Sequence, residues 1–227
     1  MTSMNASERV DFAGKARSVP AVLRFLMTPR VDRTIAVVAS VPFVYLTYLR
    51  FRTFGFDLPR MAYATGAFVL VASMIVRRPP ARVTPNPLFW LLAFAATYWG
   101  LLTVSITSQG RPLVPNWATD VIAIVSLVVL VWARLSLGRN IGFVPAQREI
   151  VTHGAYRYMR HPIYTGVFLG IFGSALRSYS PGNLALFATA ILLLVIKSFV
   201  EEGFLRTDPQ YAAYLERVRW RWFPGIA

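Results

Sequence analysis

The sequence contains no cysteine, only two histidines and only two lysines among its 227 residues. Without cysteine the chain forms no disulfide, has no thiol nucleophile and offers no thiolate ligand to zinc or to an iron–sulfur cluster. The two histidines, His153 and His161, are also too few for the histidine-rich di-iron centre of a membrane desaturase. The sequence therefore predicts no metal site.

Charged residues are scarce as well, at 15% of the chain, whereas 56% of the residues are hydrophobic and the mean hydropathy is +0.49. Soluble domains usually carry about 25% charged residues. Long apolar runs separated by Arg-rich and Pro-rich connectors are typical of a polytopic membrane protein. The first 20 residues lack a continuous apolar run, so no signal peptide is predicted.

Several familiar motifs are missing: no GxGxxG follows a strand, and there is no Walker loop and no HExxH. The net charge of +14 and the pI near 11 raise the question of nucleic acid binding. The arginines, however, lie in short connectors between apolar runs and do not gather on one soluble face. Membrane topology explains this distribution better, so we predict no nucleic acid partner.

Six apolar runs predict an all-α fold, a polytopic transmembrane helical bundle. They cover residues 34–49, 61–76, 87–104, 117–135, 163–176 and 184–205. A span needs about 20 apolar residues, with about 17 as a practical minimum. The first, second and fifth runs are short by this measure, so five or seven helices are compatible with the pattern as well as six.

The positions of lysine and arginine predict the orientation. With six spans, the N-terminal segment, two alternate connectors and the tail carry 18 of these residues, and the opposite connectors carry 5. Cytoplasmic loops of membrane proteins carry the excess of Lys and Arg. Both termini and the connector at residues 134–162 are therefore predicted to be cytoplasmic.

The densest polar and aromatic cluster is GAYRYMRHPIYTG, at residues 154–166. Pro162 suits the first turn of the following helix, where a missing N–H costs nothing. His161 and Arg160 then flank a helix N-terminus, whose free N–H groups attract anions. The tyrosines are Tyr156, Tyr158 and Tyr164. The cluster is either an interfacial aromatic belt or a site for a ligand with an anionic group and a planar ring.

A second polar motif, VIKSFVEEGFL at residues 195–205, ends the last long apolar run. Glu201 and Glu202 lie at a helix C-terminus, where the dipole disfavours negative charge. Lys197 lies four residues before Glu201, in the weaker orientation for a helical ion pair. The two carboxylates are either hydrated or need partners such as arginines, ligand hydroxyls or a ligand cation.

Four other features of the chain can be interpreted from the sequence. In the tail, aromatic and apolar residues from Tyr211 to Trp222 recur at helical spacing with interleaved arginines, which predicts a surface-lying amphipathic helix or a lid over a pocket. Gly166 and Gly170 form a GxxxG motif that favours helix packing or admits a ligand.

Asp120 is expected to favour the dipole of a first helical turn. Residues 19–26 are either an interfacial amphipathic piece or a disordered tail.

The order of these motifs is more specific than any one of them. GAYRYMRHPIYTG, an apolar hairpin, EExxL and YxxYxxRV with a later proline resemble the isoprenylcysteine carboxyl methyltransferase family of integral membrane enzymes, a superfamily that includes phospholipid methyltransferases. The resemblance covers residues 135–224. It implies a methyltransferase that uses S-adenosyl-L-methionine without a metal or a Rossmann domain. It also divides the chain into an N-terminal segment (1–33), transmembrane helices (34–135) and a C-terminal catalytic region (136–227).

The same resemblance assigns the site. It implies cofactor contacts from the loop before the RHPxY helix, from the start of that helix and from the EE helix. These residues are Arg148, Glu149, Ile150, Val151, Gly154, Tyr156, His161, Pro162, Ile163, Tyr164 and Glu201. The predicted catalytic residues are Arg160, Glu201 and Glu202, and the predicted acceptor contacts are Lys197 and Arg217.

The chemistry of the cofactor agrees with this assignment. Helix N–H groups and Arg160 suit its carboxylate, tyrosines suit its adenine ring, and Glu201 can accept hydrogen bonds from its ribose or amino groups. Methyl transfer is an in-line displacement to which orientation alone contributes several kcal/mol, about 7 or more at best. The resemblance therefore predicts a cytoplasmic cofactor pocket in the C-terminal region.

The acceptor does not carry over from the resemblance. Lys197 stands where the eukaryotic enzymes place an arginine, and the tail has RVRWRWFP where a shorter RVP-like pattern is usual. An isoprenylcysteine-like carboxylate, a phospholipid amine, an isoprenoid and a thiol all remain open as acceptors, and so does the oligomeric state. Two alternative functions are an NADPH-dependent membrane reductase of the sterol-reductase type and a non-catalytic membrane transporter or lipid-binding protein.

Overall fold

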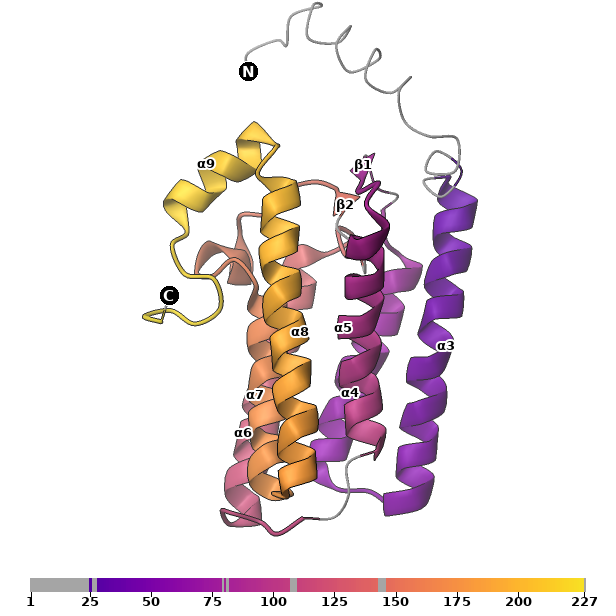
Figure 1. The fold of residues 1–227 in the computed structure, drawn as a ribbon, viewed down its shortest axis with the longest axis vertical. Coiled ribbons are helices and arrows are strands. Elements are labelled where there is room, and N and C mark those ends of the chain that lie inside the picture. Colours follow the sequence, from indigo (N-terminus) through magenta and orange to yellow (C-terminus); the bar gives the residue numbers. More distant parts are fainter. Residues whose placement is uncertain are drawn as a thin grey trace, which may run out of the picture.

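Six long helices run side by side along the long axis of the molecule (Figure 1). In this computed structural model they are α3 (Pro29–Phe54), α4 (Leu58–Ile75), α5 (Pro87–Ile106), α6 (Asn116–Leu137), α7 (Pro162–Arg177) and α8 (Pro181–Leu205). The structure describes residues 25, 28–78, 80, 82–106, 110–142 and 146–226. The predicted all-α fold is confirmed, and each of the six apolar runs lies in a helix. Apart from residue 25, the segment at residues 19–26 lies outside the described residues.

The short elements gather at one end of the bundle, near the start of α7 and the end of α8 (Figure 1). They are β1 (Arg82–Val83), β2 (Ala146–Gln147), the 3-10 helix η1 (Gly154–Arg157) and α9 (Pro209–Arg217). The two strands pair antiparallel, with Arg82 opposite Gln147. This end of the bundle therefore brings together the connectors that the charge distribution predicts to be cytoplasmic.

Within the part of the chain that the structure describes, four helices have the length and composition to cross a membrane: α3 over Arg30–Thr53, and α4, α6 and α8 over their full lengths. Large apolar side chains cover their outer faces, including Val41, Phe68, Val128 and Leu192, all more than half exposed. An apolar exterior of this extent is stable only against lipid. The helix α7 has only 16 residues, as its short apolar run predicts, and it packs between α6 and α8.

Proline and polar caps set where several helices begin. Pro162, Pro181 and Pro209 occupy the first turn of α7, α8 and α9, where the missing N–H has no intrahelical partner to lose. Ser180 caps α8 by accepting a hydrogen bond from the Asn183 N–H at 3.1 Å, and Asp208 caps α9 by accepting from the Gln210 N–H at 2.8 Å. Local sequence signals therefore determine these helix starts.

Close contact between α6 and α7 depends on the glycines of the GxxxG motif. A Cβ at Gly166 would lie 2.6 Å from Leu130 Cγ, and one at Gly170 would lie 3.0 Å from Ser126 Oγ. The Ser126 hydroxyl donates to the Gly166 carbonyl at 2.8 Å. Small residues allow helix backbones to approach in this way. The interpretation of GxxxG as a helix-packing motif is confirmed.

Asp120 acts through an ion pair rather than through a helix dipole. It is the fifth residue of α6 and therefore lies beyond the first turn where the sequence placed it. Its Oδ1 accepts from Arg177 Nη1 at 2.7 Å, and Arg177 Nη2 also lies 3.6 Å from Asp57 Oδ2. These contacts join α6, α7 and the start of α4 at the far end of the bundle, so the role of Asp120 in the structure is to hold helices together.

The tail differs from the predicted helix. The helix α9 ends at Arg217, and residues 218–226, which we call the C-terminal strap, leave it in a non-helical course. The backbone N–H groups of Arg160 and His161 donate to the carbonyls of Trp220 and Arg221 at 2.9 and 2.8 Å. These carbonyls accept hydrogen bonds from the turn before α7 and not from a following turn of helix. The helix therefore ends at Arg217 and does not reach Trp222, although the spacing predicted that it would. The strap is instead tied to the turn that precedes α7.

Candidate functional site

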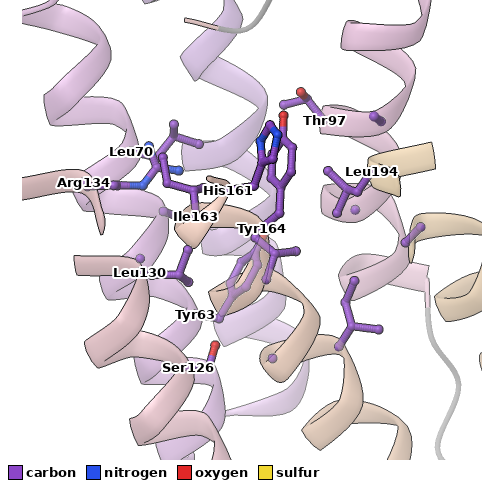
Figure 2. A pocket seen from close by; sticks show the side chains of 18 of the residues that line it. Tyr63, Leu70, Thr97, Ser126, Leu130, Arg134, His161, Ile163, Tyr164 and Leu194 are labelled. Atoms are coloured by element: carbon purple, nitrogen blue, oxygen red, sulfur yellow. The ribbon is translucent and has the colours of Figure 1, made fainter. Parts of the chain in front are cut away.

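A cavity of about 610 Å³ lies inside the bundle, large enough for a cofactor-sized or drug-sized molecule. Its middle is lined by apolar side chains such as Leu70, Leu130, Ile163 and Leu194 (Figure 2). Polar and aromatic side chains line its end near η1 and α9. The cavity therefore joins an apolar interior to a polar mouth.

Most of the predicted site residues line this cavity. They are Arg148, Glu149, Ile150, Val151, Tyr156, Arg160, His161, Ile163, Tyr164, Lys197 and Glu201. Four predicted residues do not line it: Gly154, Pro162, Glu202 and Arg217. Gly154 has a positive φ of 58° and closes a turn against Ser136, and Pro162 is buried in the first turn of α7, so both shape the site through the backbone.

Glu201 faces the cavity and has partners of its own. The Tyr164 hydroxyl donates to Glu201 Oε2 at 2.7 Å, and Lys197 Nζ lies 3.6 Å from Oε1. The Tyr164 ring stacks on His161 with centroids 5.2 Å apart, and it lies 5.6 Å from Lys197 Nζ. The side chain of Glu201 is 18% exposed. It is thus a held carboxylate at the cavity wall, not a hydrated one at the membrane surface.

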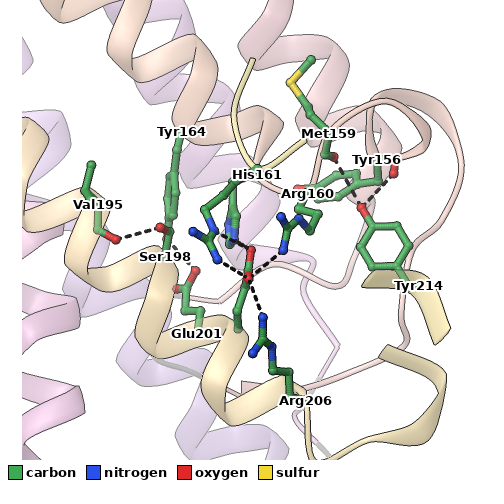
Figure 3. Close-up of polar contacts among 12 residues, drawn as sticks. Tyr156, Met159, Arg160, His161, Tyr164, Val195, Ser198, Glu201, Arg206 and Tyr214 are labelled. Carbon is green, nitrogen blue, oxygen red and sulfur yellow. Dashed lines mark hydrogen bonds and ion pairs between the residues drawn. The ribbon is translucent and has the colours of Figure 1, made fainter. Parts of the chain in front are cut away.

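Glu202 has a different environment, although it is the next residue. It is 1% exposed, and its carboxylate accepts hydrogen bonds from Arg160 Nη1 at 2.9 Å and from Arg221 Nε and Nη2 at 2.9 and 2.8 Å. His161 Nε2 lies 3.1 Å from Glu202 Oε1. Figure 3 draws these contacts together with Arg206, whose Nη2 lies 4.0 Å from Oε2.

We call Glu202 with Arg160, His161 and Arg221 the Glu202 cluster. It connects the end of α8 to the turn before α7 and to the C-terminal strap. The hydrogen bonds that Arg221 donates to Glu202 raise the pKa of Arg221. The Glu202 carboxylate is surrounded by protein cations and does not line the cavity, and its predicted catalytic role stays a prediction.

Arg160 is shared between this cluster and the cavity wall. Its Nη1 pairs with Glu202, and its Nη2 donates to the Arg219 carbonyl at 2.8 Å. Its Nε is buried and has no hydrogen-bond partner among the described residues. The guanidinium was predicted to hold a ligand carboxylate. One N–H of each terminal nitrogen is used by the protein, so the guanidinium keeps donors for a ligand, the buried Nε–H among them.

Three tyrosines form the aromatic part of the polar mouth: Tyr156 from η1, and Tyr211 and Tyr214 from α9. The Tyr214 hydroxyl donates to the Tyr156 carbonyl at 2.8 Å, which ties α9 to η1 (Figure 3). Burial raises the pKa of all three phenols, so they are neutral rings at physiological pH. Tyr211 and Tyr214 were not among the predicted site residues, although the interpretation of the tail as a lid pointed to them.

Tyr158 fits the interpretation of the 154–166 cluster as an interfacial aromatic belt. It is 52% exposed and packs near Trp132, with ring centroids 5.9 Å apart. Exposed Trp and Tyr rings at a helix end are typical of a membrane interface. The cluster therefore serves both purposes, with Tyr158 outside and Tyr156 and Tyr164 at the cavity.

The loop at residues 148–151 closes the mouth on the side of α4. Arg148 Nε donates to the Arg78 carbonyl at 2.9 Å, and Glu149 forms an exposed ion pair with the Arg78 side chain. Burial, followed by the nearby charge of Arg77, lowers the pKa of Arg148 to about 10, so its guanidinium keeps its charge at neutral pH. Arg134 also lines the cavity, as do Arg50, Arg60 and Arg177; sequence reasoning counted these arginines only as connector charges.

Comparison with known families supports the same part of the chain. Residues 114–211 match the family model described as phospholipid methyltransferase. This region is similar to phospholipid methyltransferases. The resemblance predicted from the sequence motifs is thereby confirmed, and the chain is supported as a membrane methyltransferase in general. No curated protein matches the sequence.

The boundaries of the matched segment differ from those of the motifs. The match begins just before α6, whereas the motif resemblance began at residue 135, and it ends within α9, before the C-terminal strap. It covers somewhat under half of the chain. The matched segment therefore includes α6, the helix that packs against the glycines of α7 and carries Arg134.

Proposed function

We propose that this protein transfers a methyl group from S-adenosyl-L-methionine to a lipophilic or small acceptor that enters from the bilayer. One observation carries the proposal: Tyr156, His161, Tyr164 and Glu201 line one cavity at its polar mouth. Tyr156 comes from η1, His161 and Tyr164 from the start of α7, and Glu201 from the end of α8. In the sequence, the α7–α8 hairpin separates Glu201 from the other three residues. The resemblance assigned cofactor contact to these same residues.

The groups at the mouth suit the proposed cofactor, which when bound supplies a methyl group on a sulfonium cation. Glu201, held by Tyr164 and Lys197, still has lone pairs for ribose hydroxyls or an ammonium group. The neutral rings of Tyr156 and Tyr211 offer faces for adenine or for the sulfonium charge. Arg148 and Arg160 both line the cavity and have guanidinium N–H donors that suit the carboxylate.

The protein's part in such a reaction is mainly to orient and to exclude water. An in-line displacement needs the nucleophile, the methyl carbon and sulfur in one line, and correct placement contributes about 7 kcal/mol or more at best. Glu201, Tyr164 and Lys197 form a rigid unit that can hold one reactant. The apolar walls beyond it, around Leu130 and Leu194, keep water from the reacting centre. We further propose that this mouth faces the cytoplasm, on the basis of the Lys and Arg distribution.

Binding of S-adenosylhomocysteine to the purified protein tests the proposal. Isothermal titration calorimetry is expected to detect binding to the wild type and at least a tenfold weaker affinity for Glu201→Gln, which loses a charged acceptor. Glu216→Gln is the matched control, because Glu216 is exposed on α9 and does not line the cavity. It should bind as the wild type does.

A comparison of two ligands distinguishes the proposed methyltransferase from the alternative, an NADPH-dependent membrane reductase. In a thermal-shift assay, S-adenosylhomocysteine should raise the melting temperature because it binds the folded state, whereas NADPH should leave it unchanged. Stabilisation by NADPH alone would overturn the proposed function. Binding of S-adenosylhomocysteine that is identical in the wild type and Glu201→Gln would overturn the site assignment but keep the function.

A further inference from the structure

The cavity has a second polar end, opposite the proposed cofactor mouth. Its lining along α7 extends from Ile163 to Arg177, which corresponds to about 20 Å of helix at 1.5 Å per residue. In Figure 2, Arg134 and His161 lie towards the top of the view, and Tyr63 lies lower down. The cavity therefore runs along most of the bundle and offers a ligand two separate polar regions.

Polar side chains from four helices line this second end, each within two turns of the helix end that reaches it. We call the following residues the distal site: Arg50 of α3, Arg60 and Tyr63 of α4, Thr103 of α5 and Arg177 of α7. Arg60 and Tyr63 are also electrostatic neighbours of Arg50. The helices α3, α4 and α5 precede residues 114–211, so most of the distal site lies outside the segment that matches phospholipid methyltransferases.

Two buried polar atoms of the distal site have no hydrogen-bond partner among the described residues. They are Arg50 Nε and Thr103 Oγ1, and Thr103 is only 1% exposed. Leaving a buried polar group unpaired is unfavourable, and more so for a charged one. An arginine near a helix end can extend to lipid headgroups, but Arg50 lines the cavity with a buried Nε, whereas Arg52 on the same helix is exposed. The two atoms therefore suit a ligand that accepts hydrogen bonds.

The acids near the distal site are paired with other arginines. Asp57 Oδ2 lies 3.4 Å from Arg60 Nη1 and 3.6 Å from Arg177 Nη2. Asp120 Oδ1 accepts from Arg177 Nη1 at 2.7 Å. No carboxylate in the described part of the chain lies within ion-pair distance of Arg50. Three described arginines here face two aspartates, so one positive charge has no counter-ion and the ligand that suits the site is an anion.

We propose that the distal site binds a phosphate-type oxyanion, with Arg50 as its counter-ion and the Thr103 hydroxyl as a second donor. A guanidinium presents a fork of N–H donors that matches phosphate oxygens with parallel hydrogen bonds. The ligand is free phosphate or the phosphate group of a lipid whose chain lies in the apolar middle of the cavity. It is not the methyl acceptor, because the site lies at the opposite end of the cavity from Tyr164 and Glu201. The inference therefore goes beyond the proposed function and does not depend on it.

The inference is tested with two probes, inorganic phosphate and dodecyl phosphate, added to the purified protein in a neutral detergent at constant ionic strength. Thermal-shift titrations, with chloride as the reference anion, give an apparent affinity for each probe without any need for activity. At least one probe should stabilise the wild type, and Arg50→Gln should bind it at least tenfold more weakly, since hydrogen bonds between charged groups are lost. Stabilisation by inorganic phosphate identifies a free anion as the ligand, and stabilisation by dodecyl phosphate alone identifies a lipid headgroup.

Thr103→Val separates ligand binding from a purely structural role. Because the hydroxyl has no partner among the described residues, its replacement by a methyl group should not lower the melting temperature without a probe. The affinity for the probe should nevertheless fall about threefold or more, because one donor to the anion is lost.

Arg52→Gln is the matched control for Arg50→Gln, because Arg52 is exposed on the same helix and does not line the cavity. It should bind both probes as the wild type does. S-adenosylhomocysteine affinity is measured in the same variants and should change less than twofold in Arg50→Gln.

Two results would overturn the inference. One is a wild type that neither probe stabilises relative to chloride, which needs no variant to fold. The other is a probe affinity that is the same in the wild type, Arg50→Gln and Thr103→Val, which would assign the binding to another part of this cationic protein. Failure of the proposed function looks different, because the wild type would then not bind S-adenosylhomocysteine, while probe binding would still depend on Arg50.

Discussion

Glu201 and Glu202 are neighbours in the sequence, yet they belong to different parts of the molecule. Glu201 faces the cavity, is 18% exposed and is held by one phenol and one ammonium. Glu202 is 1% exposed and is held by two arginines and a histidine from the turn before α7 and from the C-terminal strap. Successive helical residues point about 100° apart, which is enough to separate a ligand-facing carboxylate from a structural one.

This contrast shows that the EE pair combines two functions in one turn of helix. The Glu202 cluster fixes the end of α8 against the start of α7, and Tyr164 from that same start then reaches Glu201 at 2.7 Å. The geometry of the cavity wall therefore depends on the ion cluster behind it. Substitutions should separate loss of stability from loss of binding.

The largest effect is expected for Glu202→Gln. Removing this charge leaves Arg160, His161 and Arg221 buried or half-buried without their counter-ion, and breaking a buried ion pair costs about 3–5 kcal/mol. We expect a clear fall of the melting temperature in detergent. Glu201→Gln, with fewer partners and a more exposed carboxylate, should lower it much less. Equal losses of stability in the two variants would contradict the division between the two glutamates.

The next effect is expected for Arg221→Gln in the C-terminal strap. Arg221 donates twice to Glu202, and hydrogen bonds to charged groups contribute about 1.5–3 kcal/mol. Chemical unfolding should show a loss in this range. Arg219→Gln is the control, because its side chain is exposed and only its backbone carbonyl takes part. A variant of Arg219 as unstable as that of Arg221 would show that the cluster does not anchor the strap.

The smallest effect on stability is expected for Tyr164→Phe. It removes the single hydroxyl that donates to Glu201 and keeps the ring stacked on His161, so the expected loss of stability is about 0.5–1.5 kcal/mol. Because Glu201 is then less firmly held, the affinity for S-adenosylhomocysteine should fall severalfold, as calorimetry can measure. A stability loss as large as that of Glu202→Gln would place Tyr164 in the structural group instead.

Tyr164 lies on α7, so loosening the contact between α6 and α7 tests whether that contact holds Tyr164 in place. Gly166→Ala should destabilise the protein by about 1–3 kcal/mol, since its Cβ would overlap Leu130. Gly203→Ala is the matched control, because a Cβ there meets nothing within 4 Å, and in a helix interior it should stabilise by about 0.5–1 kcal/mol. Thermal unfolding of both variants checks the opposite signs; a stable Gly166→Ala would mean that α6 and α7 can separate freely.

Local signals in the sequence were sufficient for the helices. Apolar runs of membrane length, prolines in first turns such as Pro162 and Pro181, and the cap at Ser180 act within a few residues, so the six helices and several of their starts were predictable. The sequence wrongly placed Asp120 in the first turn of α6. An error of two or three residues in the predicted helix start decides whether an acidic residue lies in that turn. The tail was predicted as one helix because its spacing is helical up to Trp222, but backbone pairing with Arg160 and His161 ends the helix at Arg217.

The sequence by itself determined which side chains could meet: the ordered motifs around His161 and Glu201 predicted a site at one end of a helical membrane bundle. Only the tertiary structure decided what each one does. It turned Glu201 to the cavity and Glu202 to the arginines, brought Tyr211 and Tyr214 over the mouth, and left Arg134 buried without a protein partner. The physical reason is that the charge state and role of a polar group depend on burial and on partners from distant segments, which no local pattern records.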